Sequence, residues 1–222
     1  MEALAIPEIG ETLWTDASDF DRSPKFLNAS PELQAHARSF HELGYTVVKN
    51  AVTEEVIDDV YKDYDRWKNE NREAFESNRK PGGLPPRLVD FHTESDLVCR
   101  LFYLNKACAV QDFLFGFETS VYSSLFFEVS TQQPMHRDAP VFRTSPENFY
   151  FGMWVALEDA TLENGTLHVI DGGHRVDVDP YALAKEHFDD PFDIPDQSPE
   201  LWTAYQDAGS KACEAAELKT HQ

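Results

Sequence analysis

The sequence predicts a mainly β fold with flanking α-helices, of the sandwich or jelly-roll type. Before residue 120, two segments place apolar residues at helical spacing. Residues 120–176 instead contain four short runs of aromatic and β-branched residues, separated by polar turns. Closely spaced strands of this kind are typical of β-sandwiches and jelly rolls. A chain of 222 residues is long enough for one such domain with a sizeable core.

The first predicted helix follows an N-terminal segment without periodicity. Residues 1–29 contain many turn-forming residues, so we expect an extended or partly ordered lead-in. Ser30 and Pro31 then supply a helix cap and a proline suited to the first helical position. Gly44 follows the apolar repeat and is typical of a helix C-terminus. Residues 45–48, Tyr-Thr-Val-Val, favour a short strand.

A second amphipathic helix is predicted after Thr53, whose hydroxyl can cap the N-terminus. Its apolar residues recur at helical spacing: Val56, Val60, Tyr64 and Trp67. This pattern indicates a helix that packs with one face and exposes the other to solvent. Residues 78–86 are rich in Gly and Pro and predict a flexible loop, because Pro disrupts helices and central strands.

Four strands are predicted in the second half of the chain, at residues 121–129, 135–142, 149–157 and 166–170. The β pattern stops after residue 176, and the last 46 residues hold 11 acidic residues against three lysines. We therefore expect three regions: the lead-in at 1–29, a core of helices and strands at 30–176, and an acidic segment of loops and short helices at 177–222.

The formal net charge of −21 argues against nucleic acid or an anionic membrane as a partner, because both attract basic proteins. The apolar runs are too short to span a bilayer, and the N-terminus lacks the basic residues of a signal peptide. The three cysteines, Cys99, Cys108 and Cys213, form no CxxC pair, which indicates reduced thiols. We expect a cytoplasmic protein that acts on a small molecule.

The pair His136 and Asp138 carries the most chemical information. Residues two apart in a strand project from the same face, so an imidazole nitrogen and a carboxylate oxygen could reach one metal ion. Such a pair suits Fe(II) and forms two-thirds of the facial triad of two histidines and one carboxylate in non-heme iron oxygenases. On spacing alone, two polar residues at the rim of a strand are the more common explanation.

The surrounding sequence resembles the phytanoyl-CoA dioxygenase family of Fe(II)/2-oxoglutarate oxygenases. Family members carry a His-x-Asp strand, here 136–138, followed by a W-x-A-L-x-D-x-T-x-x-N-G-x-L pattern, which residues 154–167 match. A turn close to P-G-S-H comes next in the family, and here it reads Asp-Gly-Gly-His at 171–174. Residues 40–50 are similar to the family's helix-to-strand entry. The resemblance covers residues 33–176.

The resemblance implies a double-stranded β-helix, a cupin-like jelly roll, with the active site at its open mouth. It implies that His136 and Asp138 ligate Fe(II), and that Trp154 lines the pocket for 2-oxoglutarate, or else packs in the core. The implied reaction hydroxylates a C–H bond with O2 and converts 2-oxoglutarate to succinate and CO2; ascorbate would support it. The residue between the ligands, Arg137, departs from the family's frequent glutamine, and a surface salt bridge is its simplest role. His174 matches the histidine of the family's turn and is expected not to be a ligand.

The family's second histidine ligand and its oxo-acid-binding arginine have no counterpart after Arg175, where we also predict no further strand. We therefore expect a chain that lacks the last strands of the fold. Either it is a truncated form of a longer protein, or a partner chain covers the incomplete sheet.

Two alternatives to an enzyme of this kind stay open. One is a catalytically incomplete family member, a binding or remnant protein without enzymatic activity. The other is a cupin-like metal site with different ligands, in which His168 or His174 would join His136 and Asp138.

Overall fold

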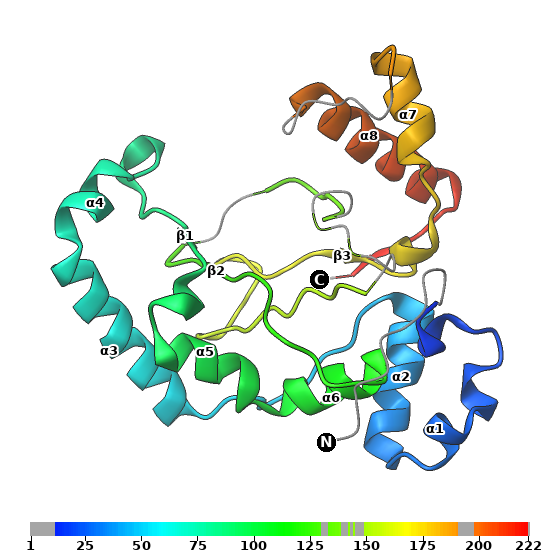
Figure 1. Ribbon diagram of the computed structural model, residues 1–222, viewed down its shortest axis with the longest axis horizontal. Coiled ribbons are helices and arrows are strands. Elements are labelled where there is room, and N and C mark those ends of the chain that lie inside the picture. Colours follow the sequence, from blue (N-terminus) through cyan, green and yellow to red (C-terminus); the bar gives the residue numbers. More distant parts are fainter. Residues whose placement is uncertain are drawn as a thin grey trace. The chain divides into compact units, whose positions relative to one another are not determined.

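The computed structural model describes residues 12–129, 133–138, 142, 144, 149–190 and 198–221. Of these residues, 51% lie in helices and 5% in strands (Figure 1). The prediction of a mainly β jelly roll is therefore wrong. The predicted strand segments do not form ladders with one another within the described part of the chain, where backbone pairing is confined to two small sheets and one isolated bridge.

Helices form most of the regular structure. The α-helices are α1 Pro24–Leu27, α2 Pro31–Leu43, α3 Glu54–Glu70, α4 Arg72–Ser77, α5 Asp96–Tyr103, α6 Lys106–Phe115, α7 Pro180–His187 and α8 Pro199–Ala215. Short 3-10 helices lie at Trp14–Asp16, Phe20–Arg22, Pro81–Gly83, Phe91–Thr93 and Gly173–Arg175. None of the helices in the described ranges has both the length and the apolar character needed to cross a membrane.

The two sheets are antiparallel and have two strands each. Strand β1 (Leu88–Val89) pairs with β2 (Leu125–Phe126), and β3 (Val169–Ile170) pairs with β4 (Thr220–His221). Strand β4 contradicts the prediction that no strand follows Arg175. Residues 45–48 form no strand, which makes that prediction wrong as well.

The described chain divides into two compact units. One contains residues 47–129 and 153–160, and the other contains residues 12–46, the described part of 133–152, and the described residues from 161 to 221. The second unit thus combines the N-terminal helices with α7, α8 and the β3–β4 sheet. The predicted lead-in contributes α1 and two 3-10 helices to it.

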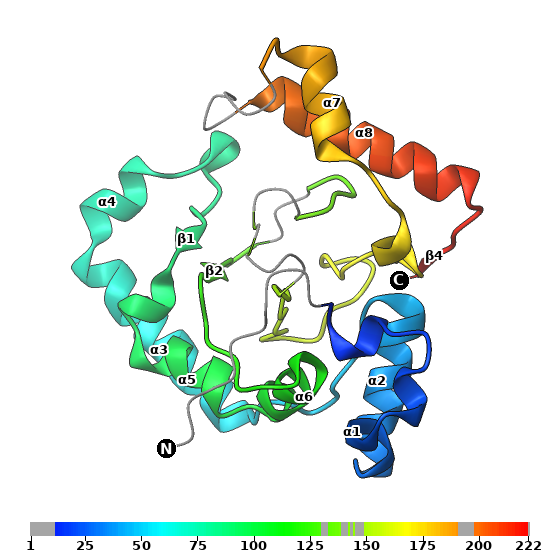
Figure 2. The same ribbon diagram turned by 45° about the vertical axis from the view of Figure 1, so that its right-hand side comes forward.

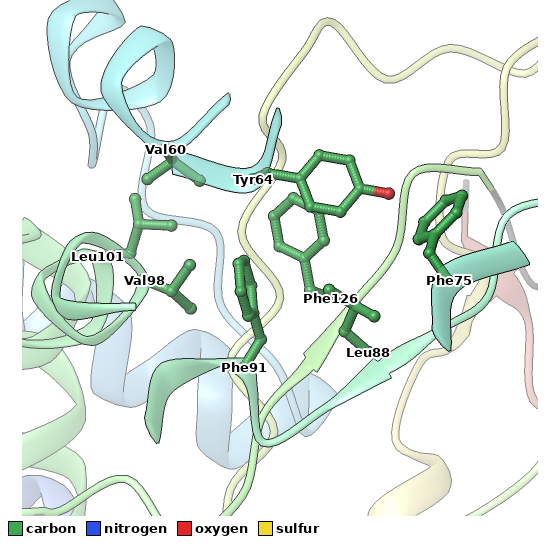
Figure 3. Packing of buried hydrophobic residues seen from close by; sticks show 8 residues of the cluster. All are labelled: Val60, Tyr64, Phe75, Leu88, Phe91, Val98, Leu101 and Phe126. Carbon is green, nitrogen blue, oxygen red and sulfur yellow. The ribbon is translucent and has the colours of Figure 1, made fainter. Parts of the chain in front are cut away.

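The first unit has an apolar core built on α3. Val60 and Tyr64, on the predicted apolar face of α3, are 0% and 3% exposed. They point toward the side chains of Phe75, Leu88, Phe91, Val98, Leu101 and Phe126 (Figure 3). Burial of these side chains supplies the hydrophobic free energy that holds α3, α4, α5 and the β1–β2 sheet together.

The second unit places α8 beside α7, as two views of the ribbon show (Figures 1 and 2). Ala184 of α7 and Tyr205, Gly209 and Cys213 of α8 are buried. The apolar positions of α8 recur every four residues, so one face of this helix is covered. This arrangement brings α8 to the site described next.

Candidate functional site

A cavity of about 390 Å³ lies within the second unit. It is bordered by the C-terminal end of α2, residues 135–138, β3 with its following turn, and α8. Side chains that can bind metals or exchange protons line it: His136, Asp138, His168, His174 and Cys213. This combination makes the cavity the candidate site.

The predicted pair lies together at this cavity. The Nε2 atom of His136 is 3.4 Å from Oδ1 of Asp138, and the two side chains are 28% and 51% exposed. The Nδ1 atom of His136 is 2.7 Å from the carbonyl oxygen of Pro134. A carbonyl only accepts hydrogen bonds, so Nδ1 carries the proton and donates it. Nε2 therefore faces the carboxylate with either a lone pair or a second proton.

The donor atoms of this pair fit a metal ion as two of its ligands. Two atoms 3.4 Å apart can both lie at the usual metal–ligand distance of about 2.1 Å from one ion. Histidine ligands commonly donate their other ring N–H to a carbonyl or a carboxylate, as His136 does to Pro134. Without a cation, a lone pair on Nε2 and the carboxylate oxygen would repel each other.

A third protein ligand is not found in the part of the chain that the structure describes. No three His, Cys, Asp or Glu side chains there are placed to hold a metal together. The other histidines at the cavity, His168 and His174, border it without joining His136 and Asp138 in such a group. The described residues thus offer a two-ligand site with open positions.

The turn at residues 171–175 packs against the C-terminal end of α2. Gly172 N donates to Leu43 O at 2.9 Å, and His174 Nε2 and the Arg175 guanidinium both reach His41 O. The last carbonyls of a helix have no partner within the helix, and these contacts provide partners. His174 therefore has a structural role at the turn.

Gly44 allows this close packing. It ends α2 at φ +84°, in the left-handed region, and a Cβ there would overlap the imidazole of His174. The predicted helix stop at Gly44 is confirmed, and the neighbouring imidazole adds a second requirement for glycine.

Burial shifts the acid–base behaviour of two groups around this turn. Burial of the imidazole, followed by the nearby Arg175 guanidinium, holds the pKa of His174 below its ordinary value. Burial, and next a hydrogen bond from its hydroxyl to Asp171 Oδ1 at 3.0 Å, raises the pKa of Tyr45. Both shifts favour the neutral form of the side chain concerned.

Trp154, the predicted co-substrate residue, belongs to the first unit. Its side chain is 49% exposed, so the alternative of a core tryptophan is not supported. Residues 151–158 alternate between partly buried and exposed positions, as expected for a strand face, although they have no ladder partner among the described residues.

The sequence reasoning missed the contribution of α8. Gln206 hydrogen-bonds the backbone of Arg137, and the ring centroids of Trp202 and His136 are 6.4 Å apart. The guanidinium of Arg137 donates to Val176 O and His174 O, where we expected a surface salt bridge. No short motif marks such contacts, because they join segments about 70 residues apart.

The chain matches known proteins at the level of a family. The family model described as phytanoyl-CoA dioxygenase (PhyH) matches residues 40–219. Phytanoyl-CoA dioxygenase domain-containing protein 1 of Bos taurus is 51% identical over 39 residues, which are 18% of this chain and 13% of that protein. The same protein of Mus musculus is 49% identical over 39 residues, again 18% and 13% of the two chains.

These alignments therefore span only a small part of the length of the curated relatives. No solved structure matches the chain significantly. The family match, by contrast, extends over most of the chain and includes His136, Asp138 and Trp154. The chain belongs to the phytanoyl-CoA dioxygenase family.

Proposed function

We propose that this chain takes part in an Fe(II)- and 2-oxoglutarate-dependent oxygenase that hydroxylates a C–H bond of a small molecule. His136 and Asp138 would hold the metal. The observation that carries the proposal is the geometry of this pair, with Nε2 and Oδ1 3.4 Å apart and Nδ1 bonded to Pro134 O. Membership of the phytanoyl-CoA dioxygenase family supports the choice of Fe(II) over other metals.

The protein groups around the pair have separate tasks. The Pro134 carbonyl fixes the tautomer of His136 and turns Nε2 toward Asp138. Asp138 supplies a negative charge that offsets part of the charge of a divalent ion. Met135, Val169 and Ile170 form an apolar part of the cavity wall beside the pair.

Bound Fe(II) would supply the oxygen chemistry, with 2-oxoglutarate converted to succinate and CO2. Trp154 is proposed as a residue that binds 2-oxoglutarate, on the basis of its place in the family pattern. Two protein ligands leave coordination positions for the oxo-acid and O2.

A second function is favoured by the same site. Because the described residues provide no third ligand, the chain could bind a metal or a small molecule without turnover. The ordinary alternative for the pair itself is an exposed ion pair between protonated His136 and Asp138, which contributes little to stability.

Anaerobic titration with Fe(II), followed by calorimetry, tests the metal site. We expect one bound ion per chain in the wild type, and a loss of binding in His136→Ala and in Asp138→Ala. His187→Ala is a matched control, because this exposed histidine at the end of α7 does not border the cavity. His168→Ala should also bind normally; a loss there would favour the cupin-like site with different ligands.

Succinate release with Fe(II), 2-oxoglutarate and ascorbate separates the two functions. Release that depends on His136 and Asp138 supports the oxygenase, and Trp154→Ala should then raise the KM for 2-oxoglutarate. Metal binding without succinate release supports the binding protein. If the wild type binds no Fe(II), the pair is an ion pair and both metal-based functions are wrong.

A further inference from the structure

One side chain of α8 holds the backbone between the two proposed ligands. The N–H of Arg137 donates to Gln206 Oε1 at 2.8 Å, and Gln206 Nε2 donates to the carbonyl of Arg137 at 2.9 Å. A single carboxamide thus makes two hydrogen bonds to one residue. The pairing resembles the exchange of two hydrogen bonds between residues of neighbouring antiparallel strands.

The position of this contact matters for the metal pair. The N–H of Arg137 belongs to the peptide group that joins it to His136, and its carbonyl belongs to the peptide group that joins it to Asp138. The φ and ψ angles between these two planar groups set the direction of both flanking side chains. Holding the two planes therefore holds the distance between Nε2 and Oδ1, which is 3.4 Å.

Among the residues that the structure describes, no strand pairs with this segment to hold it instead. Residues 133–138 pair with no strand in the described parts of the chain. The Arg137 guanidinium adds an anchor on the other side, because it donates to Val176 O at 2.6 Å. The aliphatic part of Arg137 lies against α8, since a Cβ placed on Gly209 would be 3.5 Å from its Cδ.

We propose that Gln206 is the positioning residue of the metal pair, and that α8 sets the chelating geometry of His136 and Asp138. This inference rests on the proposed function. Gln206 touches neither ligand side chain in this role; it acts through the backbone of Arg137. Groups that orient metal ligands commonly change metal affinity by about 10- to 100-fold when they are removed.

Gln206→Met tests the proposal, because methionine keeps the length of the side chain and cannot make the two hydrogen bonds. We expect the Kd for Co(II), measured by calorimetry, to rise about 10-fold or more. The visible absorption spectrum of bound Co(II) should also change, since it reports the ligand geometry and a loss of stability alone would leave it unmoved.

Gln34→Ala is the matched control. The Gln34 amide also makes two hydrogen bonds to backbone groups, to Phe26 O at 3.0 Å and Ala29 O at 3.2 Å, and it lies in the same unit away from the cavity. We expect it to lose a comparable amount of stability and to keep wild-type Co(II) affinity and spectrum.

Amide hydrogen exchange measures the contact without metal. The N–H of Arg137 should exchange slowly in the wild type and faster in Gln206→Met. Because exchange is measured on the folded protein, this difference in rate is expected even if the variant is less stable. Wild-type exchange and wild-type Co(II) affinity in Gln206→Met would overturn the positioning role alone. Absence of Co(II) and Fe(II) binding by the wild type would overturn the proposed function and this role together.

Discussion

Substitution of Gly44 by alanine tests the packing of the turn against α2. Gly44 has φ +84°, and a Cβ there would overlap Nδ1 of His174 and lie 2.7 Å from its Cγ. Two costs are therefore expected. One is the left-handed backbone conformation, which costs a non-glycine residue about 1–2 kcal/mol. The other is the steric overlap; inserting a larger side chain at a crowded site typically lowers the free energy of unfolding by about 1–3 kcal/mol.

A matched glycine separates these two costs. Gly172 lies in the same unit at φ +76°, and a Cβ there would meet only Glu42 O at 3.8 Å and Leu218 Cδ2 at 3.9 Å, which are ordinary contacts. Gly172→Ala should therefore show the backbone cost alone. Gly44→Ala should be more destabilising than Gly172→Ala by about 1–3 kcal/mol.

The double variant Gly44→Ala/His174→Ala identifies the source of this difference. His174→Ala alone loses a hydrogen bond to His41 O and should cost about 0.5–1.5 kcal/mol. Without the imidazole, only the Cβ of residue 174 stays close to the alanine at position 44, at 3.0 Å, so the double variant should be more stable than the sum of the single effects predicts. The assay is urea unfolding of all four proteins, followed by circular dichroism. Strict additivity of the two substitutions would refute the close approach of His174 to Gly44.

Further outcomes are expected for the pH profile and for substitutions at four positions. Because burial lowers the pKa of His174, the unfolded chain binds a proton more readily, so the free energy of unfolding should fall as pH drops below about 6.5. His174→Gln should flatten this part of the measured pH profile. Phe75→Ala, at a side chain 1% exposed, should cost about 3–5 kcal/mol in urea unfolding. Val89 is 58% exposed, so Val89→Ala should change the free energy of unfolding by no more than about 0.5 kcal/mol. Gly209→Ala should raise the melting temperature, because its Cβ meets only ordinary contacts and alanine favours a helix by about 0.5–1 kcal/mol.

The helices near the N-terminus could be predicted because their signals are local. Ser30 caps α2 by accepting a hydrogen bond from Leu33 N, and Thr53 does the same for α3 through Val56 N. Helical hydrogen bonds join residues four apart, so one short stretch of sequence contains donor, acceptor and cap. The same signals were present for helices that we did not predict. Ser95 and Asn105 cap α5 and α6.

The strands could not be predicted in the same way, because a strand needs a partner from elsewhere in the chain. Of the predicted run at 121–129, only Leu125–Phe126 forms a strand, paired with Leu88–Val89. Of the run at 166–170, only Val169–Ile170 does. The run at 135–142 lies only partly within the described residues. Aromatic and β-branched residues indicate an extended backbone and a half-buried face, but they do not show which other segment the strand pairs with.

The candidate site shows the same division between local and distant information. From the spacing of His136 and Asp138 in an expected strand we inferred that both side chains could reach one metal ion. In the structure residues 136–138 are not in a strand, and Nε2 of His136 lies 3.4 Å from Oδ1 of Asp138. Apart from the Pro134 carbonyl, their supports come from residues far along the chain, so neither Gln206 nor the wall formed by α8 could be predicted from the His-x-Asp motif. Which residues form the cavity wall depends on tertiary packing, whereas the spacing of the pair is visible in the sequence.

The described part of the acidic segment at 177–222 consequently has a structural role that its composition did not predict. We expected an insertion of loops and short helices, because charge without strand periodicity indicates solvated structure. In the structure, its 17-residue helix α8 contributes to the cavity wall, and β4 pairs with β3 beside the cavity. The acidic residues of α8, Glu200, Asp207 and Glu214, are exposed, whereas Tyr205, Gly209 and Cys213 on its inner face are buried. Net charge describes only the outer face of such a helix, and the inner face, with Gln206, is the part that bears on the proposed metal pair.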